Sequence, residues 1–287
     1  MAGVFVVVGR YGGAVNEDEA LPALKATFDT LDGWRERLRE TDDPPAGSAF
    51  ELDDRAWWPF PLSSCAWSKL ASAVDHLQAV RIMVDAGSLH PIATFTLTRS
   101  ALLAASEALW LLGPEDRALR QSRGLWLAEV ADKEHLLWSK EAAKGPGVIW
   151  PALAALRVTR EAHLRGYPIA RHDLPSPGPT SGLDVIAWAA QYLQPGREEW
   201  VAQARAQWRQ GSGNAHSHAF AAMSSDARER GRSSDGKLRV YGVGGSPLRT
   251  FHAYHVPFET CRRAWSRWEE LRRPDVLAWA QICDPAS

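Results

Sequence analysis

Residues 91–112 of the chain read PIATFTLTRSALLAASEALWLL, and this stretch is apolar nearly all round when it is wound as an α-helix. The polar exceptions are Arg99, Ser100, Ser106 and Glu107. A helix that is apolar on every side is buried at the centre of a protein. The stretch therefore predicts a central helix with other helices packed round it, and hence a mainly α fold.

The sequence on both sides of this central helix places apolar residues at helical spacing, between capping residues, glycines and prolines. Further helices are predicted over residues 17–40, 63–86, 114–144, 148–164, 184–193, 197–210 and 257–273. Taken together, these segments predict a helical bundle.

Two other parts of the chain have the composition and turn residues of extended structure. Lys237–Tyr241 and Thr250–Val256 are predicted strands, and Gly242–Ser246 between them is a predicted turn. Residues Lys237 to Val256 should therefore form a small β-hairpin near the C-terminus. The β-branched run Val4–Val8 ends at a glycine and predicts a short N-terminal strand that joins the hairpin.

The length and composition of the chain predict one globular domain. With 287 residues, 45% of them hydrophobic, the chain can build a substantial core, so we expect residues 1–287 to form a single mainly helical domain. Residues 166–182 are rich in proline and glycine and are the predicted internal linker.

Charge, cysteine content and hydropathy restrict the function classes. The formal net charge is -1 and the sequence pI is near 6.8, so nucleic-acid binding would need a local basic patch. Cys65, Cys261 and Cys283 form no CxxC pair, which argues against a disulfide framework and a structural zinc site. No apolar run reaches the roughly 18 residues of a membrane span, and the start lacks the basic region of a signal peptide. We therefore expect a soluble cytoplasmic protein with no membrane partner.

The stretch that most clearly suggests chemistry is residues 209–220, Arg-Gln-Gly-Ser-Gly-Asn-Ala-His-Ser-His-Ala-Phe. Gly211 and Gly213 are expected to weaken the helix that precedes them. Ser212 and Asn214 are good N-cap residues. A new helix is therefore predicted to begin within this stretch.

His216 and His218 would then lie in or near the first turn of the new helix. The amino-terminal end of a helix is electropositive and favours anions such as phosphate. Arg209 can reach the same place with a planar fork of donors. The alternative interpretation is a capped helix junction that carries surface histidines.

Charged residues in and after the central helix are a second set of candidates. Arg99 and Glu107 are eight residues apart, about two turns, so they lie near one face of a helix that should not leave a charge unpaired. Arg117, Arg120 and Arg123 recur every three residues in the next helix and form a basic edge that could meet Glu107 or an acidic ligand. Structural salt bridges or a solvated face are the alternatives to a role in a site.

Two segments resemble known helical proteins. Arg209 and His216, with six residues between them, resemble the long-spaced form of the Arg-x(4 to 6)-His motif of HEPN domains. Residues 98–123, which contain Arg99, Glu107 and Arg120, resemble a segment in uncharacterised helical proteins of actinobacterial type. Those proteins pair the segment with a Ser-x-x-x-His element, here Ser212 to His216.

The resemblance implies a fold and an activity. HEPN domains are helical bundles, and many are metal-independent ribonucleases, so the chain would be a ribonuclease or an RNA-targeting toxin or defence protein with no cofactor. His216 would move a proton, His218 would be a second proton carrier, and Arg209 would stabilise charge on the phosphate. The residues expected to bind substrate or to support these groups are Arg99, Glu107, Arg120, Ser212 and Asn214. Some of the 14 tryptophans would stack on RNA bases.

The protein is also expected to form a homodimer, because helical bundles of this kind often place the active cleft at the dimer interface.

Two alternatives from other function classes remain open from the sequence. A metal or small-molecule enzyme could use His216 and His218 together with His252 and His255 and a carboxylate. A non-catalytic helical interaction protein would instead use its histidines to cap a helix and its exposed tryptophans to contact a partner.

Overall fold

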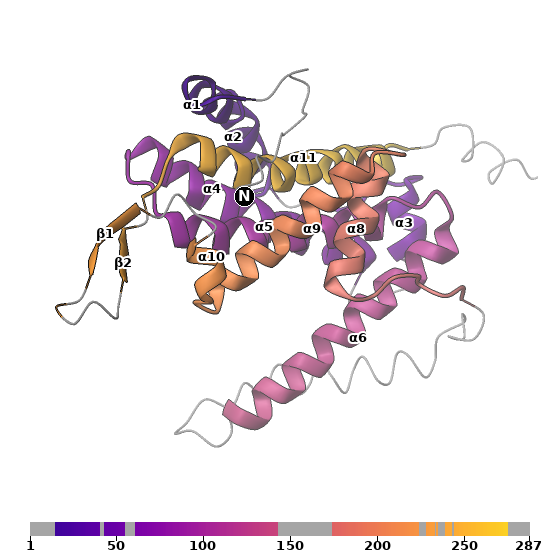
Figure 1. The fold of residues 1–287 in the computed structure, drawn as a ribbon. Coiled ribbons are helices and arrows are strands. Elements are labelled where there is room, and N and C mark those ends of the chain that lie inside the picture. Colours follow the sequence, from indigo (N-terminus) through magenta and orange to yellow (C-terminus); the bar gives the residue numbers. More distant parts are fainter. Residues whose placement is uncertain are drawn as a thin grey trace, which may run out of the picture. The chain divides into compact units, whose positions relative to one another are not determined.

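The protein is mainly α-helical, as the sequence predicts, with one small antiparallel pair of strands (Figure 1). The structure is a computed structural model, and it describes residues 15–40, 43–54, 61–142, 174–223, 228–232, 234, 239–242 and 244–274. Among the described residues, no helix combines the length and the apolar character needed to cross a membrane.

The helices and strands of the described residues carry the labels of Figure 1. In chain order they are α1 Glu17–Lys25, α2 Phe28–Arg37, α3 Ala49–Asp54, α4 Leu62–Asp85, α5 Pro91–Leu112, α6 Arg117–Ala142, α8 Gly182–Leu193, α9 Glu198–Ala215, α10 Ala219–Met223, β1 Arg228–Arg232, β2 Arg239–Gly242 and α11 Pro247–Arg272. The predicted central helix is confirmed with its bounds, as α5.

The chain groups into two compact units. The first unit comprises residues 1–41, 70–107 and 181–263, and the second comprises residues 42–69, 108–180 and 264–287. The boundaries between them fall within α4, α5 and α11, so the grouping does not test the predicted single domain, which stays a prediction.

The core of the first unit is built by α5, α8, α9 and α11. Its buried members are Leu102, Ile186, Ala187, Ala190, Trp200, Val201, Ala204 and Val256. The helices α8 and α9 lie side by side, and Gly196, with φ of 77°, makes the turn between them (Figure 1). Ser181 caps α8 by accepting a hydrogen bond from the Asp184 N–H.

The start of the first unit is a pair of short helices where the sequence predicts one helix over residues 17–40. Asn16 and Glu19 form a capping box that begins α1. The helical path breaks after α1, where the Thr27 hydroxyl donates a hydrogen bond to the Leu24 carbonyl oxygen and lies 2.9 Å from the Tyr254 hydroxyl. The contact with Tyr254 is tertiary, which is why the local pattern does not reveal the break.

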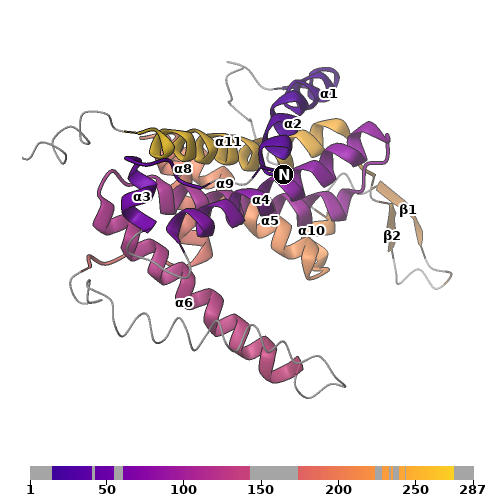
Figure 2. The ribbon, with the colours of Figure 1, turned by 180° about the vertical axis from the view of Figure 1, so that it is seen from behind.

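The predicted hairpin at Lys237 to Val256 is wrong in its second half. The observed strands β1 and β2 pair antiparallel, with Arg228 opposite Gly242, whereas Thr250–Val256 belongs to α11 (Figure 2). Buried residues of α11 recur at helical spacing: Phe251, Tyr254, Phe258, Cys261, Trp265 and Trp268. This long apolar stripe outweighs the strand preference of a short aromatic and β-branched run.

Several predictions fall partly or wholly outside the described residues. These are the strand Val4–Val8, the helix at 148–164 and residues 166–173 of the predicted linker. The described remainder of the linker, residues 174–181, has no helix or strand. It is held to α6, because Ser122 Oγ donates to the Pro175 carbonyl oxygen and Arg123 Nε donates to that of Pro177.

The tryptophans of the second unit that the structure describes are largely packed against one another. Trp67 lies with its ring centroid 5.0 Å from that of Trp268 and 5.6 Å from that of Trp265, and Trp110 lies 5.6 Å from Trp126. These rings pack in the core of the unit, whereas Trp138 of α6 is 51% exposed and has the open face that the sequence suggests.

Candidate functional site

The new helix predicted within residues 209–220 is confirmed as α10, which begins at Ala219 directly after His218, but His216 lies elsewhere than predicted. The helix α9 runs unbroken through Gly211 and Gly213 to Ala215, and His216 is its C-cap, with its N–H bonded to the Ser212 carbonyl oxygen. The carboxyl end of a helix carries partial negative charge, which favours cations. His216 therefore ends α9 and does not lie in the first turn of the new helix, whereas His218 directly precedes that turn.

Both glycines are in α9 because neighbouring groups approach its backbone closely. A Cβ at Gly211 would lie 2.5 Å from Arg99 Cβ and 2.7 Å from the Phe95 carbonyl oxygen of α5. A Cβ at Gly213 would lie 2.5 Å from the ring of Phe220. Packing against α5 and the Phe220 ring offsets the low helix propensity of glycine, which is roughly 1 kcal/mol less favourable than alanine.

A tight turn follows α9 and orients the two histidines. Ser217 has a φ of 56°, and its N–H bonds to the Asn214 carbonyl oxygen, while the His218 N–H bonds to the Gly213 carbonyl oxygen at 2.8 Å. These two bonds form a Schellman motif, in which glycine usually takes the left-handed position. The motif reverses the chain and brings His216 and His218 to the same turn.

His216 and His218 form an exposed pair of imidazoles in this turn. Their ring centroids lie 5.7 Å apart, with planes inclined by 31°. The ring of Phe220 lies 6.0 Å from that of His218, and the Phe220 side chain is 55% exposed. Two groups that can exchange protons thus lie beside an apolar ring that is open to solvent.

Arg99 of α5 contacts the same end of α9. Its Nε donates a hydrogen bond to Ser212 Oγ at 2.7 Å, and its guanidinium carbon lies 3.9 Å from the centroid of the Trp208 ring. The side chain is half-buried, and burial lowers the pKa of Arg99. The structure therefore joins two predicted residues, Arg99 and Ser212, and adds Trp208, for which the sequence shows only an apolar position of its helix.

Arg209 and Asn214 are placed less favourably for chemistry. Arg209 is exposed on α9, seven residues before His216 and so about 10.5 Å from it along the helix axis. Side chains of a helix lean towards its amino-terminal end, which directs Arg209 away from His216. Asn214 is buried and its Nδ2 donates to the Gln210 carbonyl oxygen, so it stabilises the helix end.

Glu107 lies away from the histidines. Gly211, late in α9, packs on Arg99 of α5. Ala204, earlier in α9, shares a core with Leu102, which comes later in α5. The helices α5 and α9 therefore run antiparallel. Glu107 is eight residues beyond Arg99, about 12 Å along α5, towards the amino-terminal end of α9. The structure therefore does not bring Glu107 together with His216.

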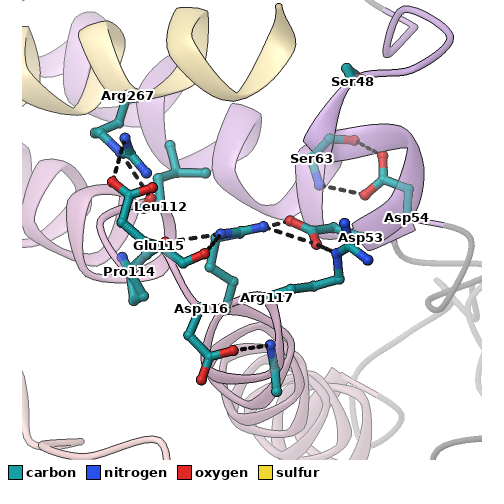
Figure 3. A network of polar contacts seen from close by, with 12 residues as sticks. Ser48, Asp53, Asp54, Ser63, Leu112, Pro114, Glu115, Asp116, Arg117 and Arg267 are labelled. Atoms are coloured by element: carbon teal, nitrogen blue, oxygen red, sulfur yellow. Dashed lines mark hydrogen bonds and ion pairs between the residues drawn. The ribbon is translucent and has the colours of Figure 1, made fainter. Parts of the chain in front are cut away.

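Asp53 is the centre of a buried ion-pair network in the second unit (Figure 3), to which Arg120 belongs. The Arg120 Nε and Nη2 donate to Asp53 at 2.8 and 3.2 Å, and its Nη1 donates to the carbonyl oxygens of Pro114 and Glu115. Arg117 also contacts Asp53, at 3.3 Å. Burial raises the pKa of Asp53, and the two arginines act in the opposite direction. Because Asp53 is fully buried, this network joins α3 to α6 and is not open to a ligand.

Other contacts in the second unit extend this structural network. Asp54 accepts hydrogen bonds from the N–H and the hydroxyl of Ser63 at the start of α4, and Arg267 bonds to Glu115 (Figure 3). Asp53 and Asp54 lie in α3, which is not among the helices predicted from the sequence. No local pattern identifies a partner 67 residues away for Asp53.

His252 and His255 lie on α11, where burial lowers the pKa of each. The His255 ring stacks on that of Phe251 at 5.1 Å and meets the Trp200 ring edge-on at 5.8 Å. Within the described ranges, no three His, Cys, Asp or Glu side chains come together in a way that could hold a metal ion. The structure therefore provides no geometry in support of the predicted alternative of a metal enzyme.

Comparisons of the chain with models of protein families, with curated proteins and with solved structures gave no significant match.

Proposed function

We propose that the turn after α9 is the active site of a metal-independent ribonuclease. The observation that carries the proposal is the exposed pair His216 and His218, with ring centroids 5.7 Å apart. Imidazole changes its protonation state near neutral pH and is the side chain most often used in general acid–base catalysis. A pair at this separation can flank a single phosphate group.

The reaction needs one base and one acid. One imidazole accepts the proton of the RNA 2′-hydroxyl as that oxygen attacks phosphorus. The other imidazole, protonated at the start, donates its proton to the 5′-oxygen as the bond from phosphorus to that oxygen breaks. The products are a 2′,3′-cyclic phosphate and a 5′-hydroxyl, and the two histidines end with their protonation states exchanged.

The surroundings of the pair suit an RNA chain. The exposed ring of Phe220, 6.0 Å from that of His218, offers a face on which a base can stack. Arg209, exposed two turns earlier on α9, is placed to contact a neighbouring phosphate of the chain.

The proposal includes the place where the protein acts and its oligomeric state. We expect the protein to act on RNA in the cytoplasm, as a toxin or a defence protein, and to form a homodimer. Sedimentation at micromolar concentration should give twice the mass of the chain, and a monomer would contradict the homodimer.

The experiment that tests the proposal is an RNA cleavage assay in the presence of a chelator. The wild type should cleave RNA under these conditions. His216→Ala and His218→Ala should each slow cleavage by about 100-fold or more, the range of general acid–base catalysis. His90→Ala is the matched control, because His90 is also exposed and lies in the same unit, and it should cleave like the wild type.

One observation favours the alternative of a non-catalytic interaction protein. An open, mainly apolar hollow of about 590 Å³ lies at the start of α5, and it includes Ile92, which is 50% exposed. Exposed apolar surface of this kind is typical of partner sites. The same assay separates the two functions, because the alternative predicts a folded wild-type protein that leaves RNA intact.

A further inference from the structure

The half-buried guanidinium of Arg99 is held in a fixed plane. Its side chain leaves α5 where α9 approaches most closely, beside Gly211, whose missing Cβ leaves room for it. The Nε–H donates to Ser212 Oγ at 2.7 Å, and the guanidinium stacks on Trp208, with 3.9 Å from its carbon to the ring centroid. Two contacts from α9 thus set both the direction and the plane of the group.

The two terminal amino groups of Arg99 have no such partners. Among the described residues, no carboxylate or carbonyl oxygen accepts a hydrogen bond from Nη1 or Nη2 of Arg99, and no ion pair involves it. Arg120 differs, because its fork is satisfied by Asp53 and by two carbonyl oxygens. A partly desolvated cation with an open planar fork favours an anion that can accept two parallel hydrogen bonds.

Arg99 contacts the last turns of α9, which lead to the proposed catalytic pair. Ser212 is four residues before His216 on α9, which is one helical turn, about 5–6 Å between their Cβ atoms. Trp208, on which the Arg99 guanidinium stacks, lies eight residues before His216. The sequence resemblance assigns the phosphate contact to Arg209, and Arg99 adds an oriented cation from another helix.

We propose that Arg99 binds a phosphate group of single-stranded RNA through Nη1 and Nη2, with Ser212 and Trp208 as positioning residues. That the phosphate belongs to RNA rests on the proposed function. The existence of an anion site at Arg99 rests on its two orienting contacts and its open fork. Arg99 contacts one phosphate of the chain beside Ser212 and Trp208, and Arg209 contacts another.

The test measures binding separately from cleavage. The probe is a single-stranded RNA oligonucleotide in which every 2′-hydroxyl is methylated, so that it cannot be cut by its own 2′-oxygen. Arg99→Gln should weaken its binding about tenfold, as expected for a lost charge-assisted pair of hydrogen bonds. A plot of log binding constant against log salt concentration has a negative slope. The magnitude of this slope should decrease by about 0.7 in Arg99→Gln, the value for one phosphate contact on a single strand.

Three further proteins make the result decisive. Arg205→Gln is the matched control, since Arg205 is an exposed arginine of α9, and its effect should be smaller. Arg99→Lys keeps the charge and loses the fork, so it should weaken binding while the salt slope stays near that of the wild type. It also supplies the test if Arg99→Gln fails to fold. In Ser212→Ala the fork loses its orienting partner, and binding should weaken to an intermediate degree.

The outcomes for the anion site and for the ribonuclease are distinct. The anion site would be overturned if folded Arg99→Gln kept the affinity and the salt slope of the wild type. It would also be overturned if folded Arg99→Lys kept the wild-type affinity. Either result would count even if the wild type cleaves RNA. Weak binding by Arg99→Gln beside a wild type that does not cleave RNA would support the site and contradict the ribonuclease. Binding of inorganic phosphate that competes for Arg99 without any binding of the oligonucleotide would contradict RNA as its source.

Discussion

Arg99 Nε and Ser212 Oγ lie 2.7 Å apart although 113 residues separate them in the chain. This hydrogen bond joins the central helix α5 to the carboxyl end of α9. It orients the Arg99 fork at the end of α9 that precedes His216, so the stability of the fold and the geometry of the proposed anion site depend on the same contact.

Replacing Ser212 with alanine should destabilise the protein measurably. The change leaves the Nε–H of a half-buried cation without its acceptor, and we expect a loss of about 1–2 kcal/mol in the free energy of unfolding. Urea denaturation measures it. Ser100→Ala is the control, since the Ser100 hydroxyl bonds to the Thr96 carbonyl oxygen of its own helix, and it should lose less. Equal effects would argue that the tertiary hydrogen bond contributes nothing.

Two glycine substitutions should change stability in opposite directions. Gly211→Ala places a Cβ 2.5 Å from Arg99 Cβ and should destabilise by about 1–3 kcal/mol, because α5 and α9 must move apart. Gly33→Ala in α2 has nothing within 4 Å of the new Cβ and should stabilise by up to about 1 kcal/mol through helix propensity. Thermal melts of the two variants give the comparison, and stabilisation by Gly211→Ala would refute the close packing.

The buried pair of Asp53 and Arg120 should show a large effect when one partner is removed. Asp53→Ala leaves the buried Arg120 guanidinium uncompensated and should destabilise by about 3–5 kcal/mol. The double variant Asp53→Ala with Arg120→Met should regain part of this loss, because no buried charge remains. Glu259→Ala, which removes a partly exposed pair with Arg262, should cost less than about 1 kcal/mol in the same urea titration. A small effect of Asp53→Ala would mean that water reaches the network.

Acid should destabilise the first unit through His255. Burial lowers the pKa of His255 in the folded protein below its ordinary value near 6.5, so the unfolded chain binds more protons than the folded chain as the pH falls past that value. The contribution of His255 to stability is therefore fully present above pH 6.5. It is lost as the pH falls from this value through the pKa of His255 in the folded protein.

His255→Phe keeps a ring to stack on Phe251 and removes the proton site. The loss of stability between pH 7 and pH 5 should be smaller in this variant than in the wild type, as measured by the urea midpoint at each pH. Because His252 titrates in the same direction, part of the pH dependence should remain. Identical pH profiles in the two proteins would show that His255 accepts a proton without penalty.

The sequence predicts the helices well where a long apolar stripe controls the outcome. The all-round apolar pattern of residues 91–112 identifies α5 with its bounds, and the Pro195-Gly196 pair correctly separates α8 from α9. Thr250–Val256 is mistaken for a strand because its preference is judged over seven residues, whereas α11 is stabilised by a stripe that continues to Trp268.

The site is predictable only in its residue types. The histidines and Arg99 are found from sequence because polar groups in an apolar chain are conspicuous. The helix in which these residues lie cannot be predicted in the same way, because a glycine weakens an isolated helix and yet permits close packing in a folded protein. Only the approach of Phe95 and Arg99 to Gly211 decides between these roles, and that contact is tertiary.

The central claim is that His216 and His218 cut RNA through its 2′-hydroxyl without a metal ion. The most direct measurement uses an oligodeoxynucleotide that contains a single ribonucleotide, incubated with the protein and a chelator. We predict one cut, directly after the ribonucleotide, with a 2′,3′-cyclic phosphate on the product, and a rate that falls about 100-fold or more in His216→Ala and in His218→Ala. An intact oligonucleotide, or the same cut at the same rate by folded His216→Ala, would contradict the claim.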